Sequence, residues 1–273
     1  MSYEQFEVTV ANSRPLRLYL FQRGDSLYWG YTNADRDIQH SGYTYVKTAI
    51  SDDGIRQTGE PDNDMLKISV PSDNEIVSLF KATQPSEEIE VIVRDLDWQD
   101  LDNSLVVWVG SVASVSIPKE ATAEINCASL MLSLQQTALK RTYNRNCDYA
   151  IYSTNCGLNK ADFAVQGTIA AISGATLTCN LSSSPRHSLA YGFIEWKTNN
   201  GQAVERRGID SANTNQVTLL GGAGGLHVGQ SITLYPGCDQ SSATCKNVYS
   251  NFINYGGFRH LPGKSPFDGT PID

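Results

Sequence analysis

Apolar and polar residues alternate strictly in Leu66-Lys67-Ile68-Ser69-Val70, and this pattern decides the fold class of the chain. Because successive side chains of a strand point to opposite faces, the alternation predicts a β-strand with one buried face. The same period recurs on both sides of this segment. It predicts further strands over residues 6–10, 16–20, 43–46, 89–93, 105–117 and 121–134.

One short helix is expected among these strands. Pro71-Ser72-Asp73-Asn74 supplies an N-cap before the run from Glu75 to Phe80. Clusters of Gly, Pro, Asp and Asn at 23–25, 51–54, 59–63 and 100–103 predict the turns. Many short strands at regular spacing favour a barrel or a sandwich, so the fold is predicted to be mainly β.

The second half of the chain is also predicted to be rich in strands. Asn199-Asn200-Gly201-Gln202 indicates a hairpin turn. Gly221-Gly222-Ala223-Gly224-Gly225 matches no phosphate-binding motif and is expected to be a flexible loop. The tail from residue 247 to 273 is expected to wrap over the domain surface. The predicted strands cover residues 163–172, 176–181, 191–196, 204–209 and 231–234.

Length and charge suggest two domains in one 273-residue chain. Residues 1–140 carry a net charge of −10 and residues 141–273 one of +2, which predicts a boundary near residue 140. An acidic first half argues against sequence-independent binding of nucleic acid. No window approaches 18 consecutive apolar residues, so no membrane span is expected. The polar start lacks a signal-peptide core, so folding in the cytoplasm is expected.

Two cysteine pairs carry the candidate chemistry. Eight residues separate Cys147 from Cys156, and six separate Cys238 from Cys245. In a reducing compartment metal ligation competes with disulfides and free thiols, and four thiolates suit an iron–sulfur cluster or Zn²⁺. Structural zinc usually has two to four residues between paired cysteines, so these gaps favour a larger cluster. Gly157 and Gly237 flank the pairs and are expected to let backbone N–H groups approach sulfur.

The remaining candidates for chemistry are weak. Cys127 and Cys179 lie on predicted strands and are expected to be buried core thiols. The four histidines are scattered, no Gly-x-Ser-x-Gly elbow occurs, and the Asp-rich stretch 95–102 lacks the glycine and distal glutamate of a calcium loop. No enzyme is therefore expected.

Several segments together resemble a family of phage tail hub or tail tip proteins, which also occurs in gene transfer agents. The resemblance extends over nearly the whole chain, and the spacing of the cysteines is similar to that of the lambda-type tail tip protein L. The segments that carry it are residues 18–24, 31–38, 129–134, 141–147, 155–157, 236–239 and 251–263.

The resemblance implies a structural virion protein with two domains. Residues 1–140 would form a β-barrel-like hub domain, and residues 141–273 a β-rich domain that binds a [4Fe–4S] cluster through Cys147, Cys156, Cys238 and Cys245. It further implies a ring, as a homotrimer, at the distal end of the tail tube. The partners would be the distal tail protein, the tape measure protein and the central fibre or receptor-binding tail proteins.

Two other function classes stay open on the sequence. One is a redox or electron-transfer protein built on the cluster, although no flavin or nicotinamide motif accompanies the cysteines. The other is a zinc-stapled adhesin that binds host sugars through exposed aromatic residues, for which Trp29, Tyr31, Trp98 and Tyr255 are the candidates.

Overall fold

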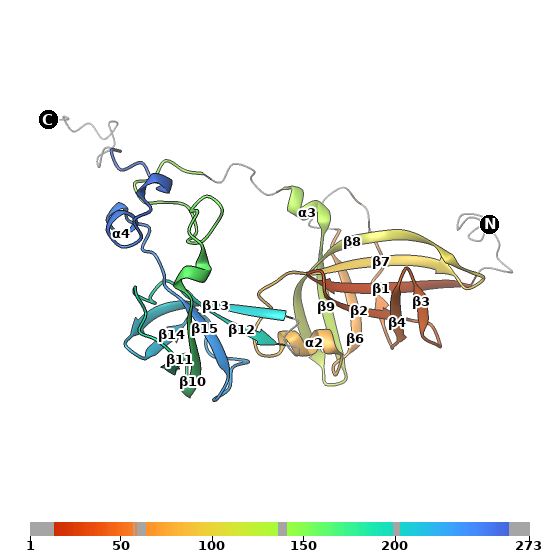
Figure 1. Cartoon of the computed structure of the whole chain (residues 1–273). Coiled ribbons are helices and arrows are strands. Elements are labelled where there is room, and N and C mark those ends of the chain that lie inside the picture. The colour runs from red at the N-terminus through yellow and green to blue at the C-terminus, as the bar shows by residue number, and fades with distance from the viewer. Residues whose placement is uncertain (1–13, 57, 59–63, 136–140, 199–202, 262–273) are drawn as a thin grey trace. The chain divides into compact units, whose positions relative to one another are not determined.

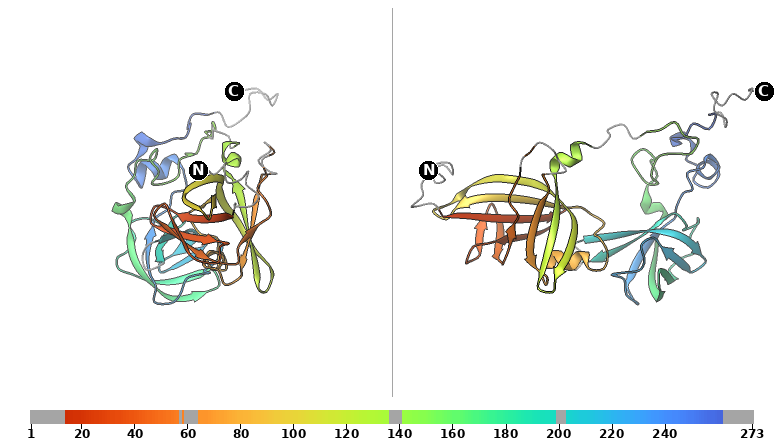
Figure 2. Two further views of the ribbon diagram at one scale, coloured as in Figure 1. Left: turned by 90° about the vertical axis from the view of Figure 1, so that its right-hand side faces the viewer. Right: turned by 180° about the vertical axis from the view of Figure 1, so that it is seen from behind.

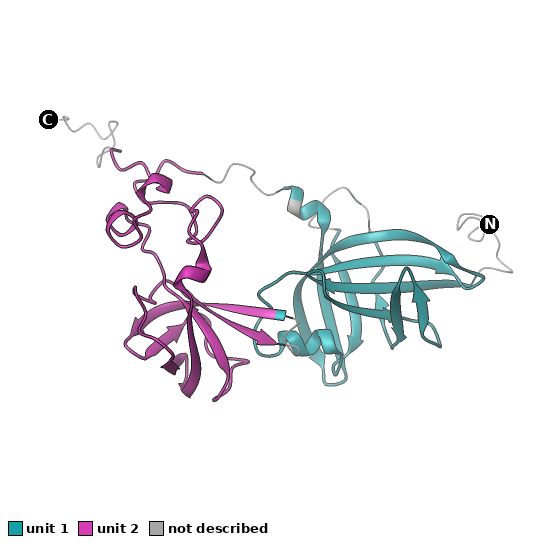
Figure 3. Ribbon diagram, viewed as in Figure 1, with its two compact units in different colours: residues 1–136, 199–203 teal, residues 137–198, 204–273 magenta. Residues whose placement is uncertain are grey.

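The computed structural model describes residues 14–56, 58, 64–135, 141–198 and 203–261 (Figure 1). The chain divides into two compact units (Figure 3). Unit 1 comprises residues 1–136 and 199–203, and unit 2 comprises residues 137–198 and 204–273. The predicted mainly β fold class is confirmed, because both units are built on strands.

Unit 1 is a large, curled sheet (Figures 1 and 2). Its nine strands within the described residues lie in the order β3-β4-β2-β1-β7-β8-β9-β6-β5. All neighbours pair antiparallel except β2 and β4, which run parallel. The strands are β1 (Pro15–Arg23), β2 (Leu27–Thr32), β3 (Ile38–His40), β4 (Tyr43–Lys47), β5 (Ser51–Asp52), β6 (Leu66–Pro71), β7 (Ile89–Asp97), β8 (Asp100–Lys119) and β9 (Thr122–Ser129).

Strand alternation places apolar side chains on both faces of this sheet. Tyr19 and Phe21 of β1 belong to the main core, which the sheet encloses. Leu18 and Leu20, one position along, belong to a smaller cluster on the opposite face. Each of the two faces therefore needs its own cover.

Side chains, rather than a backbone ladder, bring the far edge of this sheet back to its middle. The Tyr19 hydroxyl donates to Oδ2 of Asp52 across 2.5 Å, and Arg17 Nη1 donates to the same oxygen across 2.8 Å. β5, which carries Asp52, pairs with β6, and these side-chain hydrogen bonds connect it to β1. Unit 1 therefore curls like a barrel, and within the described residues the closed barrel lies in unit 2.

The predicted helix of unit 1 is confirmed, and one predicted strand is partly wrong. α2 (Glu75–Phe80) starts where expected, with Asn74 Oδ1 accepting the Ile76 N–H. The strand predicted over 121–134 ends at Ser129, and α3 (Leu130–Leu134) follows as a short helix. The residues of α3 are leucine, methionine and serine, which favour or tolerate a helix. Because β9 is already paired along its length, the chain forms a helix after Ser129 instead of extending the strand.

Unit 2 is a closed barrel that carries loops and short helices at one end (Figure 1). The strands close in the order β10-β11-β14-β13-β12-β15 around a core that includes Ile169, Leu177, Ile194 and Leu234. The elements are η1 (Lys160–Phe163), β10 (Val165–Ser173), β11 (Thr176–Leu181), β12 (Phe193–Thr198), β13 (Ala203–Asn213), β14 (Gln216–Leu219), β15 (Ser231–Tyr235), α4 (Ser242–Asn247) and η3 (Phe252–Asn254).

The glycine-rich loop after β14 is anchored by an arginine. Arg207 Nη1 donates to the carbonyls of Gly222 and Gly224, at 2.7 and 2.9 Å, and its guanidinium lies over the Trp196 ring. The predicted loop is confirmed, and two of its carbonyls have Arg207 as a hydrogen-bond donor. The predicted hairpin turn at 199–202 falls outside the described residues. Of the described helices, none has the length and apolar character needed to cross a bilayer.

Candidate cysteine site

The four paired cysteines line one cavity in unit 2. Cys147, Cys156, Cys238 and Cys245 come from segments about 100 residues apart, yet they lie around the same small space. All six cysteines of the chain are free thiols in the structure. The other two are buried where the sequence placed them, Cys127 in the core of unit 1 and Cys179 in the barrel. Burial raises the pKa of Cys127 to about 12, as expected of an inert core thiol.

Each cysteine of the second pair is positioned by a local turn. Cys238 follows β15, and its Sγ accepts the N–H of Gln240 across 3.3 Å. Cys245 lies in α4, whose N-cap is Ser241; the Ser241 side chain accepts the Thr244 N–H. The Asp239 carboxylate accepts the Ser241 N–H and so fixes the turn between the two cysteines.

The first cysteine pair is tied to the second by the backbone. The Cys147 N–H donates to the carbonyl of Gln240 across 2.9 Å. Cys156 ends a series of turns, where its N–H donates to the Ser153 hydroxyl. The two loops therefore meet through a backbone hydrogen bond as well as through the cavity between their thiols.

The C-terminal segment completes the site, which the sequence analysis did not predict. Asn251 Nδ2 donates to the Cys156 carbonyl at 2.6 Å and approaches its Sγ at 3.7 Å. The Asn251 carbonyl accepts from the Cys245 thiol, and the Gly256 N–H donates to Cys147 Sγ, each across 3.3 Å. The tail was expected only to wrap the surface. The many Asn and Gly residues of this tail could have indicated N–H donors near the cysteines. Composition alone does not show which sulfur each donor reaches.

The glycines next to the cysteine pairs do not themselves donate to sulfur. The Gly157 N–H donates to the Ser153 carbonyl and that of Gly237 to the Ser188 carbonyl, so neither bonds to sulfur. Gly157 has φ +72°, which favours glycine, and a Cβ on Gly237 would lie 2.1 Å from the Ala190 carbonyl oxygen. These glycines permit a turn and a close packing, whereas Gln240 and Gly256 supply the donors to sulfur.

An aromatic cluster packs between the cysteine loops and the barrel. Tyr152 contacts the rings of Phe163, Phe193 and Tyr235, and its hydroxyl donates to the Pro236 carbonyl. Tyr249, which lines the cavity, donates to the Gly237 carbonyl across 2.5 Å. Burial, with the nearby Cys238, raises the pKa of Tyr249 to about 12. These rings therefore pack the cysteine loops against the barrel, and the hydroxyls of Tyr152 and Tyr249 each have a carbonyl acceptor.

A buried carboxylate adds a second attachment. Oε1 of Glu195, on β12, accepts from Lys160 Nζ of η1 at 2.8 Å and from Arg206 Nε of β13 at 2.7 Å. Burial by itself would raise the pKa of Glu195, but these two cationic donors outweigh it and hold the pKa below its usual value. Glu195 thus links the segment after Cys156 to the barrel.

The thiols influence one another electrostatically. Burial is the largest cause that raises the pKa of Cys245, and the neighbouring Cys238, Cys147 and Cys156 raise it further. Burial also raises the pKa of Cys238, against the opposing effect of the Gln240 N–H. No three His, Cys, Asp or Glu side chains in the described parts of the chain are arranged as a single metal ion requires. The site is thus four thiols around a shared space rather than a convergent mononuclear set.

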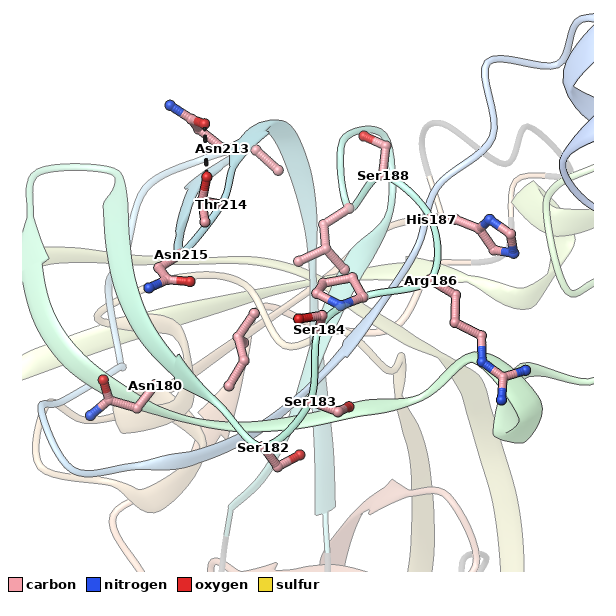
Figure 4. Close-up of a pocket in the computed structure, with 14 residues that line it drawn as sticks. Asn180, Ser182, Ser183, Ser184, Arg186, His187, Ser188, Asn213, Thr214 and Asn215 are labelled. Carbon is pink, nitrogen blue, oxygen red and sulfur yellow. Dashed lines mark hydrogen bonds between the residues drawn. The ribbon is translucent and has the colours of Figure 1, made fainter.

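A larger polar cavity lies at the barrel loops (Figure 4). Its volume is about 910 Å³, and the loop 180–189 and the β13–β14 turn line it. Serine and asparagine side chains dominate the lining. The ring of His187 packs against Phe163 and Tyr249, so the histidine belongs to the aromatic cluster rather than to the serines. We assign no chemistry to this cavity.

The aromatic residues suggested for sugar binding make packing and hydrogen-bond contacts within their own units. Tyr31 is 8% exposed and belongs to the core of unit 1. Trp29 donates to Glu75, Trp98 lies under the Arg36 guanidinium, and Tyr255 donates to the Arg145 carbonyl in unit 2. These contacts explain the four rings as packing and anchoring residues.

Comparison with known families gives two matches. Residues 14–159 match the family described as "Baseplate hub protein, N-terminal attachment domain". Residues 187–265 match the family described as "Phage conserved hypothetical protein BR0599". The first match covers more than half of the chain and all the strands of unit 1.

Individual proteins are also similar to the chain. An uncharacterized protein of Xylella fastidiosa (strain 9a5c) is 29% identical over an alignment of 189 residues, and the match covers 63% of this chain and 38% of that protein. The chain therefore spans about two fifths of that relative. A solved chain from the "Virion of native gene transfer agent (GTA) particle" has a TM-score of 0.77 at 17% identity, and the match covers 99% of this chain and 96% of that one.

Proposed function

This chain belongs to the baseplate hub protein family, and we propose that it is a structural protein of the tail tip of a phage or phage-like particle. The family match over residues 14–159 carries the proposal. The fold shared with a chain of the gene transfer agent virion supports it. In this role the chain forms a ring, as a homotrimer, at the distal end of the tail tube. It then contacts the distal tail protein, the tape measure protein and the central fibre or receptor-binding tail proteins.

The second part of the proposal is a [4Fe–4S] cluster held by Cys147, Cys156, Cys238 and Cys245. The donor set fits such a group, because four free thiols line one cavity in unit 2. In a cubane each cysteine holds a different iron, so the four sulfurs need not converge on one ion. A single zinc needs convergent ligands, and no described set of three has that arrangement. The gaps of eight and six residues within the cysteine pairs favour the cluster over zinc.

The surroundings of the cysteines also suit an iron–sulfur group. Thiolate ligands are stabilised by N–H donors, which orient them and set the potential of the group. Gln240 N–H and Gly256 N–H reach Cys238 and Cys147, and Asn251 Nδ2 lies beside Cys156. Three of the four sulfurs thus have a nitrogen donor nearby before any group is bound.

The proposed role of the cluster is structural. Segment 141–159 contains no helix or strand, and segment 236–261 contains only the short helices α4 and η3, so these segments bury little surface by regular structure. When bound, the cluster supplies four covalent attachments that join these two segments. Metal-binding free energy of this kind is folding free energy, about 10 kcal/mol or more for structural sites. The residues around it orient the thiolates and fasten the loops to the barrel.

Particle assembly tests this proposal. The gene for this chain is deleted from the genes that encode the particle. The deletion strain is then complemented with a gene for the wild-type chain or for the Cys147→Ser variant. Tails are counted by electron microscopy, and the delivery of DNA to host cells is measured as a titre. We expect no finished tails without the chain and at least a tenfold loss with Cys147→Ser. Cys179→Ala, which changes a thiol of the barrel core, is the matched control and should assemble. Normal particles from the deletion strain would refute the hub role.

A further inference from the structure

Residues 251–261, which we call the strap, supply part of the wall of the cysteine cavity. Asn251 and Asn254 line this cavity beside the four thiols. The Asn251 N–H donates to the Cys245 carbonyl across 2.9 Å, and the Asn251 side chain donates to the Cys156 carbonyl. The strap therefore forms one side of the space in which the cluster is proposed to lie.

The strap is fastened to segment 141–149 by hydrogen bonds that do not involve sulfur. The Phe258 N–H donates to the Asn144 carbonyl across 2.8 Å. Arg145 Nε donates to the Leu261 carbonyl, also across 2.8 Å. These two bonds lie toward the C-terminal end of the strap, so they hold that end in place independently of the thiols.

The strap also packs closely on this segment. The ring of Phe258 lies 4.8 Å from the ring of Tyr143. A Cβ at Gly257 would collide with the Arg145 carbonyl oxygen, a backbone atom that cannot move by a side-chain rotation. A larger residue at this position would therefore push the strap away from the segment that holds it.

Little buried surface keeps the strap closed. Among its residues only Asn251 and Gly256 are buried, and Ile253 is 92% exposed. The hydrophobic core of the barrel is built from residues 165–234 and includes no residue of the strap. Segments with few buried apolar contacts and exposed hydrogen bonds open locally at a lower free energy than the whole domain unfolds. The strap is therefore expected to open while the barrel stays folded.

We propose that the strap is a gate, and that its opening is the step that limits the release of iron from the cysteine site. The inference rests on the proposed cluster and names the part of the chain that controls its loss. In the closed strap the Gly256 N–H reaches Cys147 Sγ and the Asn251 side chain lies beside Cys156 Sγ. The hydrogen bonds to segment 141–149 hold it there. Opening removes two donors from sulfur and one wall of the cavity in a single movement.

Release of iron from the cluster-loaded chain tests the gate. The rate is measured without oxygen at rising concentrations of bathophenanthroline disulfonate, a chelator of ferrous iron. We expect the rate to reach a plateau, because release then waits for the strap to open. Arg145→Gln, which removes the bond to Leu261, should raise the plateau about tenfold. Arg259→Gln is the matched control and should keep the wild-type plateau, because this guanidinium lies over Phe252 within the strap itself.

A second variant and a second measurement make the test independent of one substitution. Gly257→Ala disturbs a different contact of the strap and should also raise the plateau. Backbone hydrogen exchange of the loaded chain reports opening without iron release. The Phe258 N–H should exchange faster than the N–H of Ile209, which donates to the Gly192 carbonyl in the barrel. Arg145→Gln should speed exchange at Phe258 and leave exchange at Ile209 unchanged.

The failure of the gate is distinguishable from the failure of the cluster. A release rate that keeps rising in proportion to the chelator, or a plateau that neither strap variant changes, would overturn the gate while the cluster proposal stands. Equal acceleration of exchange at both amides would show that the whole of unit 2 opens rather than the strap, and would also overturn it. A chain that takes up no iron would overturn the gate and the cluster proposal together.

Discussion

The backbone N–H of Gly256 donates a hydrogen bond to Sγ of Cys147 across 3.3 Å, although 109 residues separate the two in the sequence. With Asn251, this contact makes the C-terminal segment part of the wall around the four thiols. The segment returns to the loop where unit 2 begins, so both ends of the unit depend on the same site. Changes in either segment are therefore expected to affect the retention of iron and the stability of unit 2 together.

The first prediction concerns the space around Gly256. A Cβ at this position would lie 2.7 Å from the ring of Tyr149, a side chain that lines the cavity. Gly256→Ala should therefore lower the stability of unit 2 by about 1–3 kcal/mol, the usual cost of overpacking. Anaerobic thermal unfolding measures it. Gly208→Ala is the control, because its Cβ would meet only the end of the Leu220 side chain. Equal effects of the two substitutions would contradict the account.

The second prediction concerns the buried amide beside Cys156. Asn251→Asp keeps the shape of the side chain but replaces the N–H donor with a carboxylate facing sulfur. Loss of an outer-shell donor typically weakens metal retention about 10–100-fold. Iron release to a chelator should be faster by about that factor. Asn213→Asp, at an exposed position of β13, should release iron at the wild-type rate, and an unchanged rate in Asn251→Asp would remove this residue from the site.

Much of this architecture was predictable from the sequence, for identifiable reasons. Alternation located β1, β6 and β7, and Asn74 gave the start of α2, because these signals are local. The position of the closed barrel could not be predicted from local signals, because closure depends on which edge strands pair. The four cysteines were recognisable by their spacing and by the family resemblance, and that resemblance is confirmed by the baseplate hub match. The donors Gln240, Asn251 and Gly256 depend on the folded path of loops, which composition does not give.

The third prediction concerns the closure of the unit 1 sheet. Burial alone would raise the pKa of Asp52, but hydrogen bonds from Tyr19 and Arg17 outweigh it and hold the pKa below its usual value. A carboxyl group whose pKa is lowered in the folded state stabilises the fold above its unfolded pKa of about 4, and this stability is lost as the pH falls through the folded value.

Asp52→Asn should therefore lower the unfolding free energy of unit 1 by about 1–3 kcal/mol at pH 7. The difference from wild type should begin to shrink below about pH 4, where the unfolded chain takes up a proton at Asp52, and should keep shrinking as the pH falls through the lower folded value. Urea unfolding at pH 7 and pH 3 measures both values. Asp25→Asn, at an exposed turn, is the control. A pH-independent difference would show that the charge of Asp52 does not hold the sheet edge.

The fourth prediction concerns the attachment of the cysteine loops to the barrel. Glu195→Gln leaves Lys160 and Arg206 without their shared carboxylate, so unit 2 should lose about 1–3 kcal/mol. Because none of the three residues lines the cysteine cavity, iron content should stay near the wild-type value. The unfolding temperature and the iron content are measured on the same sample. Asp210→Asn, at an exposed position of β13, is the control and should match wild type in both. Loss of iron without loss of stability would place Glu195 in the site itself.

The measurement that tests the central claim most directly is a metal analysis of the chain purified without oxygen. The account predicts a brown protein with a broad absorbance near about 400 nm and about four iron and four sulfide per chain, all lost in Cys147→Ser. A colourless, folded chain that holds one zinc, or no metal at all with its cysteines oxidised, would contradict it.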